Sequence, residues 1–108
     1  AANKRVKNIL EKSGRTQGVD ASLFAQDEER RLEAALGALA PQVEASVAGG
    51  DFGAALLAVA KIRGDVDAFF DKVLVNAEDP AVRANRLALL TGLERVLNRV
   101  ADISRLAA

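Results

Sequence analysis

The stretch DPAVRANRLALLTGLERVLNRVADIS, residues 79–104, decides the fold class of this 108-residue chain. It opens with a strong helix-start signal, because Asp79 can accept hydrogen bonds from the first free backbone N–H groups. Pro80 takes the first helical position, where a missing N–H costs nothing. Apolar residues then recur every three or four positions from Leu89 to Ile103, and further leucines widen that stripe. The pattern predicts a long helix with neighbouring helices on two sides, as at the centre of a bundle.

Two earlier segments have the same apolar period. Residues 2–12 place three aliphatic side chains on one side and lysines elsewhere, and a helix-ending Ser-Gly pair follows. Residues 27–48 repeat Leu and Val at spacings of three and four. We expect Pro41 to kink that second helix without ending it, because the apolar stripe continues on both sides.

The segment between residues 51 and 75 predicts two shorter helices. Asp51 caps the first, which stops at Gly64, and Asp65 caps the second. Such closely spaced caps and stops predict a helical hairpin with a very short connection. No alternation of period two occurs over any length. The expected fold is therefore all-α, a bundle of about five helices with a long C-terminal helix, in a single domain over residues 1–108.

Charge is distributed unevenly along the chain, although the net charge is zero. Residues 1–18 are basic, with Glu11 as their one acidic residue, and residues 81–108 are basic again, whereas the middle is acidic. If the first and last helices lie near each other, a neutral protein can still present one basic face.

The composition excludes most kinds of catalytic site. The chain has no His and no Cys, which removes the usual general base, the thiolate nucleophile and most zinc sites. Asp67 and Asp71 lie four residues apart on one helix face, but a working carboxylate pair needs a cleft and perturbed pKa values. We interpret them as bystanders or ion-pair partners, and expect no catalytic residue, no metal site and no cofactor in this chain.

Candidate RNA contacts lie at the two basic ends. The cations of NKRVKNILEK, residues 3–12, can neutralise phosphates, and its second Asn can reach a base or a ribose. An ordinary solvated helix face is the alternative reading of that stretch. Two polar residues flank the apolar stripe of the last helix and are expected to reach outward. The RNA-binding candidates are Lys4, Arg5, Lys7, Asn8, Lys12, Arg83 and Asn85.

Arg86 falls on the apolar stripe of the last helix. A buried, unpaired guanidinium is too costly to expect, so a carboxylate partner is predicted. Asp67, Asp71 and Glu78 are the candidates, because the preceding helix must pack back across a short turn. We favour a structural ion pair with Asp67 or Asp71 over a contact between Arg86 and RNA or a partner protein.

Three stretches together, NKRVKNIL, VDAFFDKVLVNAEDPAVRANRLALL and RVADIS, resemble one family. They are similar to the C-terminal end of the β subunit of bacterial glycyl-tRNA synthetase, the α2β2 class II enzyme. The likeness is nearly continuous from Val66 to Ser104, with Asn76 at a position where the family commonly has Met. That end of the β subunit is an anticodon-binding domain of the DALR type, similar to the all-helical C-terminal domain of arginyl-tRNA synthetase.

The resemblance implies a cytoplasmic module that binds the anticodon region of glycine tRNA. ATP, Mg²⁺ and glycine would be handled elsewhere, on the α subunit, and the partners would be the α subunit and the rest of the β subunit, with neither membrane nor DNA. It also implies the end of a longer chain, without the family's upstream helices, which would leave Val6, Ile9 and Leu10 exposed or packed between copies. The alternative function is a helical scaffold between proteins that makes no direct contact with RNA.

Overall fold

Helix α5, Pro80–Ala107, is the central element of the fold. The computed structural model describes residues 2–16 and 18–107, with side chains for residues 4–16 and 18–102. Asp79 caps α5 as the sequence predicts, because its Oδ1 accepts the N–H of Ala81 at 2.9 Å and that of Val82 at 3.4 Å. The expected stripe residue Ile103 and the basic Arg105 lie outside the described side chains.

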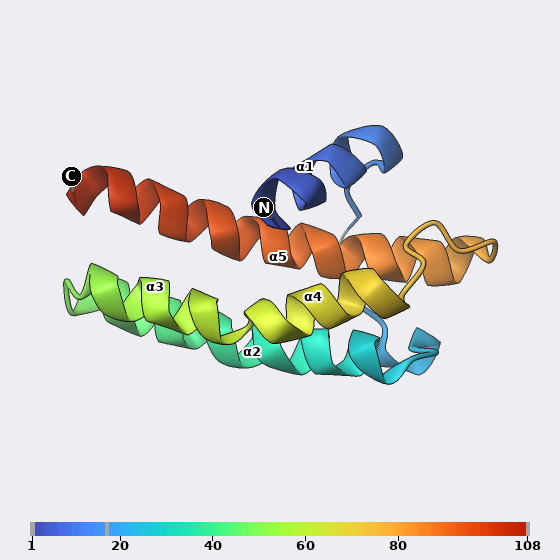
Figure 1. The fold of residues 1–108 in the computed structure, drawn as a ribbon, viewed down its shortest axis with the longest axis horizontal. Coiled ribbons are helices and arrows are strands. Elements are labelled where there is room, and N and C mark those ends of the chain that lie inside the picture. The colour runs from blue at the N-terminus through green and yellow to red at the C-terminus, as the bar shows by residue number, and fades with distance from the viewer. Residues whose placement is uncertain (1, 17, 108) are drawn as a thin grey trace.

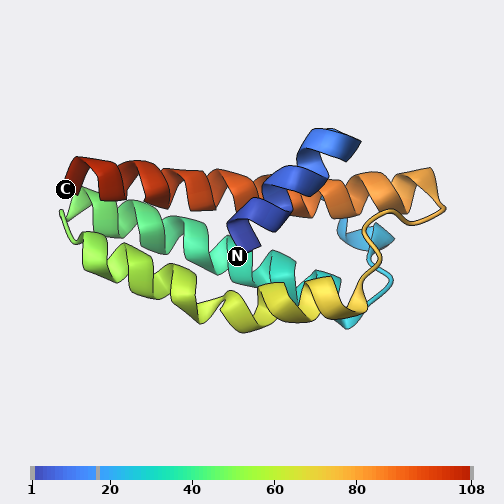
Figure 2. The ribbon, with the colours of Figure 1, turned by 45° about the horizontal axis from the view of Figure 1, so that its top comes forward.

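The remaining helices lie on two sides of α5. Helix α1, Ala2–Ser13, crosses one side, and α2, Asp27–Ala48, lines the other together with α3, Phe52–Lys61, and α4, Arg63–Lys72 (Figures 1 and 2). A single 3₁₀ turn, Ala21–Leu23, lies between α1 and α2, and the described residues form no strand. The all-α prediction and the central place of the last helix are therefore confirmed, as is the proximity of the first and last helices.

The apolar side of α1 is buried against α5. Val6 and Leu10 are fully buried and Ile9 is half-buried, all within one chain. The expectation that these side chains would be exposed or covered by a second copy is therefore wrong. Gly14 ends α1 in the left-handed conformation (φ 91°), and its N–H bonds to the carbonyl of Leu10 at 2.8 Å.

Helix α2 passes through Pro41 without a break. Pro41 is exposed, so water can reach the carbonyl of Gly37 that a proline ring leaves without its N–H partner. The buried side of the helix is the predicted stripe of Leu32, Leu36, Leu39 and Val43. The prediction that Pro41 does not divide this helix is confirmed.

The connection between α3 and α4 differs from the predicted hairpin. Asp51 caps α3 as expected, accepting the N–H of Ala54 at 3.0 Å, but α3 ends at Lys61 and only Ile62 separates it from α4. Gly64 therefore lies in the first turn of α4, and Asp65 is not its cap. The two helices continue along the same side of α2 and do not fold back on each other (Figure 1). Ile62 is itself buried in the core, so the turn keeps the apolar sides of both helices inward.

Candidate nucleic-acid interface

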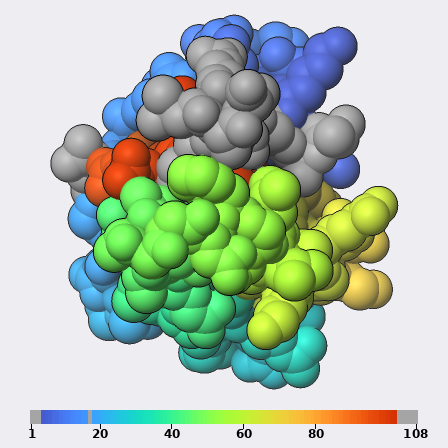
Figure 3. Space-filling model, turned by 90° about the vertical axis from the view of Figure 1, so that its left-hand side faces the viewer, coloured from blue at the N-terminus to red at the C-terminus, as the bar shows by residue number. Residues whose placement is uncertain are grey.

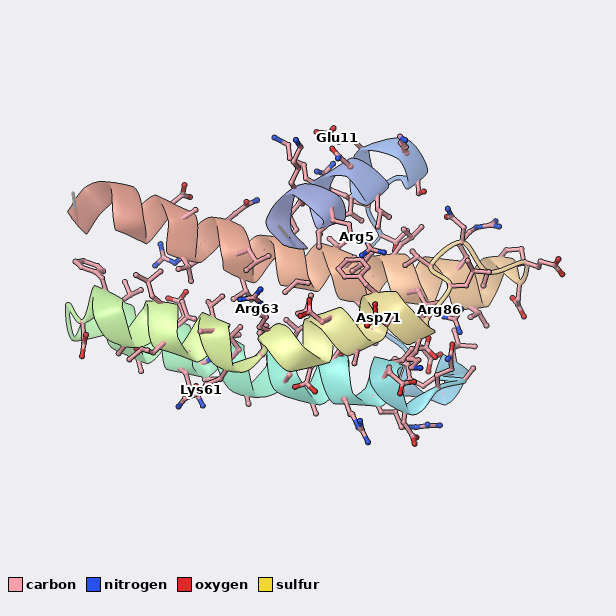
Figure 4. The ribbon with its side chains drawn as sticks, viewed as in Figure 1. Arg5, Glu11, Lys61, Arg63, Asp71 and Arg86 are labelled. Carbon is pink, nitrogen blue, oxygen red and sulfur yellow. The ribbon has the colours of Figure 1, made fainter. Side chains whose placement is uncertain are left out.

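The outward face of α1 is basic. Lys4, Lys7 and Lys12 are exposed, and Asn8 is exposed on the same helix. Among the described side chains, none of these lysines lies within 4.0 Å of a carboxylate oxygen. Glu11 is the acidic residue of this helix and extends away from the body of the molecule (Figure 4). Three ammonium groups on one short helix are therefore available to phosphate oxygens.

Arg5 extends from α1 towards α4. Its guanidinium carbon lies 4.3 Å from the centre of the Phe70 ring, which is within the range of a cation–π contact. Phe70 in turn meets Phe69 edge to face, with ring centres 5.9 Å apart. Figure 4 shows Arg5 between the two helices. This contact, which the sequence did not indicate, holds α1 against α4 while Arg5 stays exposed.

The segment after α1 is fixed to α5 by a second set of polar contacts. Arg15 donates two hydrogen bonds to Glu94, Nε to Oε1 at 2.7 Å and Nη2 to Oε2 at 2.8 Å. These bonds lower the pKa of the Glu94 carboxyl. Thr16 adds a bond from its hydroxyl to the carbonyl of Ala84 at 2.7 Å. The basic helix is therefore held in place at both of its ends.

The two candidate contacts on α5 are largely engaged within the domain. Arg83 is half-buried, and its Nη1 donates to the carbonyl of Ala77 at 3.2 Å. Asn85 is only 3 % exposed. Its Oδ1 accepts the N–H of Asp20 at 2.7 Å, and its Nδ2 donates to the carbonyl of the same residue at 3.0 Å. Asn85 is therefore buried and does not reach outward as expected.

Arg86 is buried, 6 % exposed, and its charged partner is Glu29 on α2. Its Nε donates to Glu29 Oε1 at 2.9 Å, and its Nη1 donates to the carbonyl of Leu74 at 2.6 Å. Nη2 lies 3.3 Å from Oε1 of Gln26. The guanidinium is therefore a structural group, as predicted, but its partner is not the predicted one.

Asp67 and Asp71 are both exposed on α4. They face solvent because α4 buries Val66 and Phe69, which places the neighbouring positions outward. Asp67 lies 3.9 Å from Arg63 one turn earlier on the same helix, and neither aspartate contacts Arg86.

The sequence contained a signal for the true partner of Arg86. Glu29 lies three residues before Leu32, on the buried stripe of α2, and three residues after Gln26, the N-cap of that helix. Such a spacing is typical of a capping box, in which the glutamate bonds back to the start of the helix.

Glu29 is fully buried, and all of its charge is compensated by hydrogen bonds. Its Oε2 accepts the N–H groups of Ala25 at 2.8 Å and Gln26 at 2.9 Å, while Oε1 faces Arg86. Burial alone raises the pKa of this carboxyl, but the bonds from Arg86 and the two backbone groups outweigh it, so the pKa of Glu29 is lowered. No buried side-chain nitrogen or oxygen in the described part of the chain lacks a hydrogen-bond partner.

A second surface feature is apolar and lies on α3. Leu56 and Leu57 are exposed, Leu57 to 68 %, although both are large aliphatic side chains. Helix α3 forms the centre of the face seen in Figure 3, at the end where α2 passes into α3.

In the ranges that the structure describes, no three His, Cys, Asp or Glu side chains gather as metal ligands. No helix there has the length and apolar character needed to cross a membrane.

The family model of the DALR anticodon binding domain matches residues 1–104, and the chain belongs to this family. Three relatives share the name "Glycine--tRNA ligase beta subunit". The relative from Thiobacillus denitrificans is 56 % identical over 110 residues, and that from Delftia acidovorans is 53 % identical over 110 residues. Each alignment covers 100 % of this chain but only 16 % of the relative. A shorter relative from Neisseria gonorrhoeae is 51 % identical over 107 residues, which cover 98 % of this chain and 85 % of the relative.

Proposed function

We propose that this chain is the anticodon-binding module of a glycine–tRNA ligase beta subunit and that it binds the anticodon region of glycine tRNA. The observation that carries the proposal is the exposed face of α1 with Lys4, Lys7 and Lys12, in a domain of the anticodon-binding family. Lysines that neutralise phosphates release condensed counterions, which supplies affinity without reading sequence. Asn8 lies among these lysines and can contact a base or a ribose.

The candidate contacts differ in how free they are to bind. The three lysines and Asn8 carry the backbone contact. Arg5 offers a planar guanidinium above Phe70, and Arg83 contributes with the part of its side chain that stays accessible. Asn85 does not belong to this surface, because both ends of its amide are bound to Asp20.

In this proposal the module positions the tRNA while other parts of the enzyme carry out the chemistry. ATP, Mg²⁺ and glycine bind to the alpha subunit, and this chain holds no cofactor. Its protein partners are the alpha subunit and the rest of the beta subunit, and the enzyme acts in the cytoplasm, where tRNA is charged. Neither a membrane nor DNA is a partner.

The test is equilibrium binding of a glycine tRNA anticodon stem-loop, followed by fluorescence anisotropy at several salt concentrations. Charge reversal of Lys4 or of Lys7 should each weaken binding and reduce the slope of log K against log [salt] by about 1. Lys61→Glu is the matched control, because Lys61 is an exposed lysine on the opposite side of α5 from α1 (Figure 4). No binding at about 50 mM salt, or an equal effect of the control, would contradict the proposal.

A scaffold between proteins is the second candidate function, and the exposed leucines of α3 favour it. An apolar pair such as Leu56 and Leu57 is typical of a surface that meets another protein. A pull-down experiment distinguishes the scaffold from the RNA-binding module. It compares how the wild type and Leu57→Ser capture the alpha subunit and the remaining beta chain. Leu57-dependent capture without any RNA affinity would establish the scaffold in place of the RNA-binding module.

A further inference from the structure

The chain between α4 and α5, residues 73–79, is held through its backbone. Three side chains, from the start of α2 and from the first turns of α5, donate hydrogen bonds to backbone carbonyl groups, one at the last residue of α4 and two within the loop. The bonds run from Gln26 Nε2 to Lys72 at 2.8 Å, from Arg86 Nη1 to Leu74 at 2.6 Å, and from Arg83 Nη1 to Ala77 at 3.2 Å. The loop therefore has a fixed path although it is not helical.

One of these donors, Arg86, is buried and links the loop to one residue of α2 and to the N-cap of that helix. Arg86 bonds to Glu29, and Gln26 Oε1 accepts from Arg86, so the loop carbonyls connect directly to the interior of the bundle. A segment that is already ordered before binding loses little conformational entropy when a ligand arrives. The 73–79 loop can therefore bind a ligand with little loss of conformational entropy.

Side chains alternate along the first part of the loop. Val73 and Val75 are buried, whereas Leu74 is 68 % exposed and Asn76 is exposed. Arg86 and Arg83 bond to carbonyl groups of the loop, and Ser13 bonds only to Oδ1 of Asn76. The Leu74 side chain and the Asn76 amide nitrogen therefore remain on the surface. An exposed leucine on a fixed backbone contributes little to the core of this domain.

The loop is continuous with the basic surface of α1. The Ser13 hydroxyl, at the last residue of α1, donates to Asn76 Oδ1 at 3.4 Å. Lys12 precedes Ser13 on that helix and is exposed. The amide nitrogen of Asn76 keeps two donors for other partners.

From this arrangement we infer that the 73–79 loop contacts the unpaired bases of the RNA, with Leu74 against a base face and the Asn76 amide at a base edge, while the lysines of α1 bind the phosphates. Proteins usually read single-stranded RNA through bases that are unstacked and exposed. Arg86 is the positioning residue of this contact, because it fixes the loop without touching the RNA. The inference rests on the proposed RNA-binding function. It assigns to the 73–79 loop the part of the surface that distinguishes one anticodon from another.

The test compares two stem-loops, one with the glycine anticodon and one whose anticodon bases are all replaced by uridine. Asn76→Ala should weaken binding of the glycine stem-loop about tenfold and leave binding of the uridine stem-loop unchanged, because it removes the contact to a base edge. Leu74→Ala should weaken binding of both stem-loops, because every base has a face, and neither substitution should change the salt slope. Leu57→Ala is the matched control, because Leu57 has the same 68 % exposure on α3. The control should bind both RNAs as the wild type does.

Arg86→Lys tests the positioning role separately. Lysine keeps a positive charge beside Glu29 but cannot also donate to both Leu74 and Gln26 with the geometry of a guanidinium. At a temperature at which circular dichroism shows the variant folded, it should lose discrimination as Asn76→Ala does, with an unchanged salt slope. In the Asn76→Ala background it should cause no further loss of discrimination.

The outcomes distinguish the RNA-binding function of the domain from the role of the 73–79 loop. Absence of any binding by the wild type would overturn both the RNA-binding function and the role of the loop. Binding without discrimination by the wild type, or full discrimination by Asn76→Ala, would overturn the role of the loop alone.

Discussion

Replacing Arg86 with Met removes all three hydrogen-bonding nitrogens from a buried position and keeps a side chain of similar shape. Glu29 Oε1 and the carbonyl of Leu74 then lose their donors, and Glu29 keeps only the two backbone N–H groups at its other oxygen. Removal of one partner of a buried ion pair costs about 3–5 kcal/mol. A domain of this size is stable by about 5–15 kcal/mol, so the loss is a large share of the total.

Urea unfolding at pH 7, followed by circular dichroism, measures this loss. With an m-value of about 1.5 kcal/mol/M, a loss of about 3 kcal/mol lowers the midpoint by about 2 M. Arg63→Met is the matched control, because the Arg63 side chain is 85 % exposed and lies 3.9 Å from Asp67. That exposed pair should contribute less than about 0.5 kcal/mol.

A second substitution shows whether the cost comes from the uncompensated charge of Glu29. Glu29→Gln removes the charge and keeps an oxygen that can accept from the backbone of Ala25 and Gln26. Arg86→Met with Glu29→Gln should therefore be more stable than Arg86→Met alone. If the double variant is less stable, or if Arg86→Met costs no more than Arg63→Met, the assignment of a buried, compensated ion pair is refuted.

Three further predictions concern stability and are read from unfolding curves. Because the pKa of Glu29 is lowered by folding, its carboxylate contributes fully to the free energy of unfolding above the ordinary glutamate pKa, and this contribution is lost as the pH falls through the lowered value. The wild type should therefore lose more stability than Glu29→Gln from about pH 4.5 downward. Equal losses in the two proteins would contradict this. Leu10→Ala should cost about 2–5 kcal/mol, since Leu10 is fully buried between α1 and α5, against a change near zero for Leu57→Ala. Asp51→Ala should cost about 0.5–2 kcal/mol through the lost helix cap, whereas Asp65→Ala, which removes no cap, should cost clearly less.

Local signals in the sequence were sufficient for most helix boundaries. Helix α2 has the predicted bounds, and the caps Asp51 and Asp79 accept the expected backbone N–H groups. These features depend on residues within one helical turn, so they can be read without knowing the rest of the fold. The width of the stripe on α5 also indicated correctly that it has neighbours on two sides.

Contacts between distant segments could not be read in the same way. Glu29 and Arg86 are 57 residues apart, and Asp20 and Asn85 are 65 residues apart. The choice of Asp67 or Asp71 as partner assumed that α4 packs back against α5 with these carboxylates facing Arg86, whereas α4 turns both aspartates to solvent. Which carboxylate meets a buried arginine is therefore a property of the packed bundle.

The candidate interface could likewise be predicted only where it depends on local sequence. The exposed lysines of α1 follow from helical periodicity, because their positions oppose the buried Val6 and Leu10. The cation–π contact of Arg5 with Phe70 and the fixed path of the 73–79 loop depend on how α1, α4 and α5 pack together. Sequence periodicity identifies the charged face, and only the tertiary structure identifies the loop beside it.

The most direct test of the RNA-binding assignment is an NMR footprint of the glycine tRNA anticodon stem-loop on the ¹⁵N-labelled domain. We expect the largest changes in amide shifts at Lys4, Lys7, Asn8 and Lys12 and at Leu74 in the adjoining loop. The amides of α3 should keep their positions throughout the titration. Changes centred on α3, or no changes at a saturating RNA concentration, would contradict the assignment.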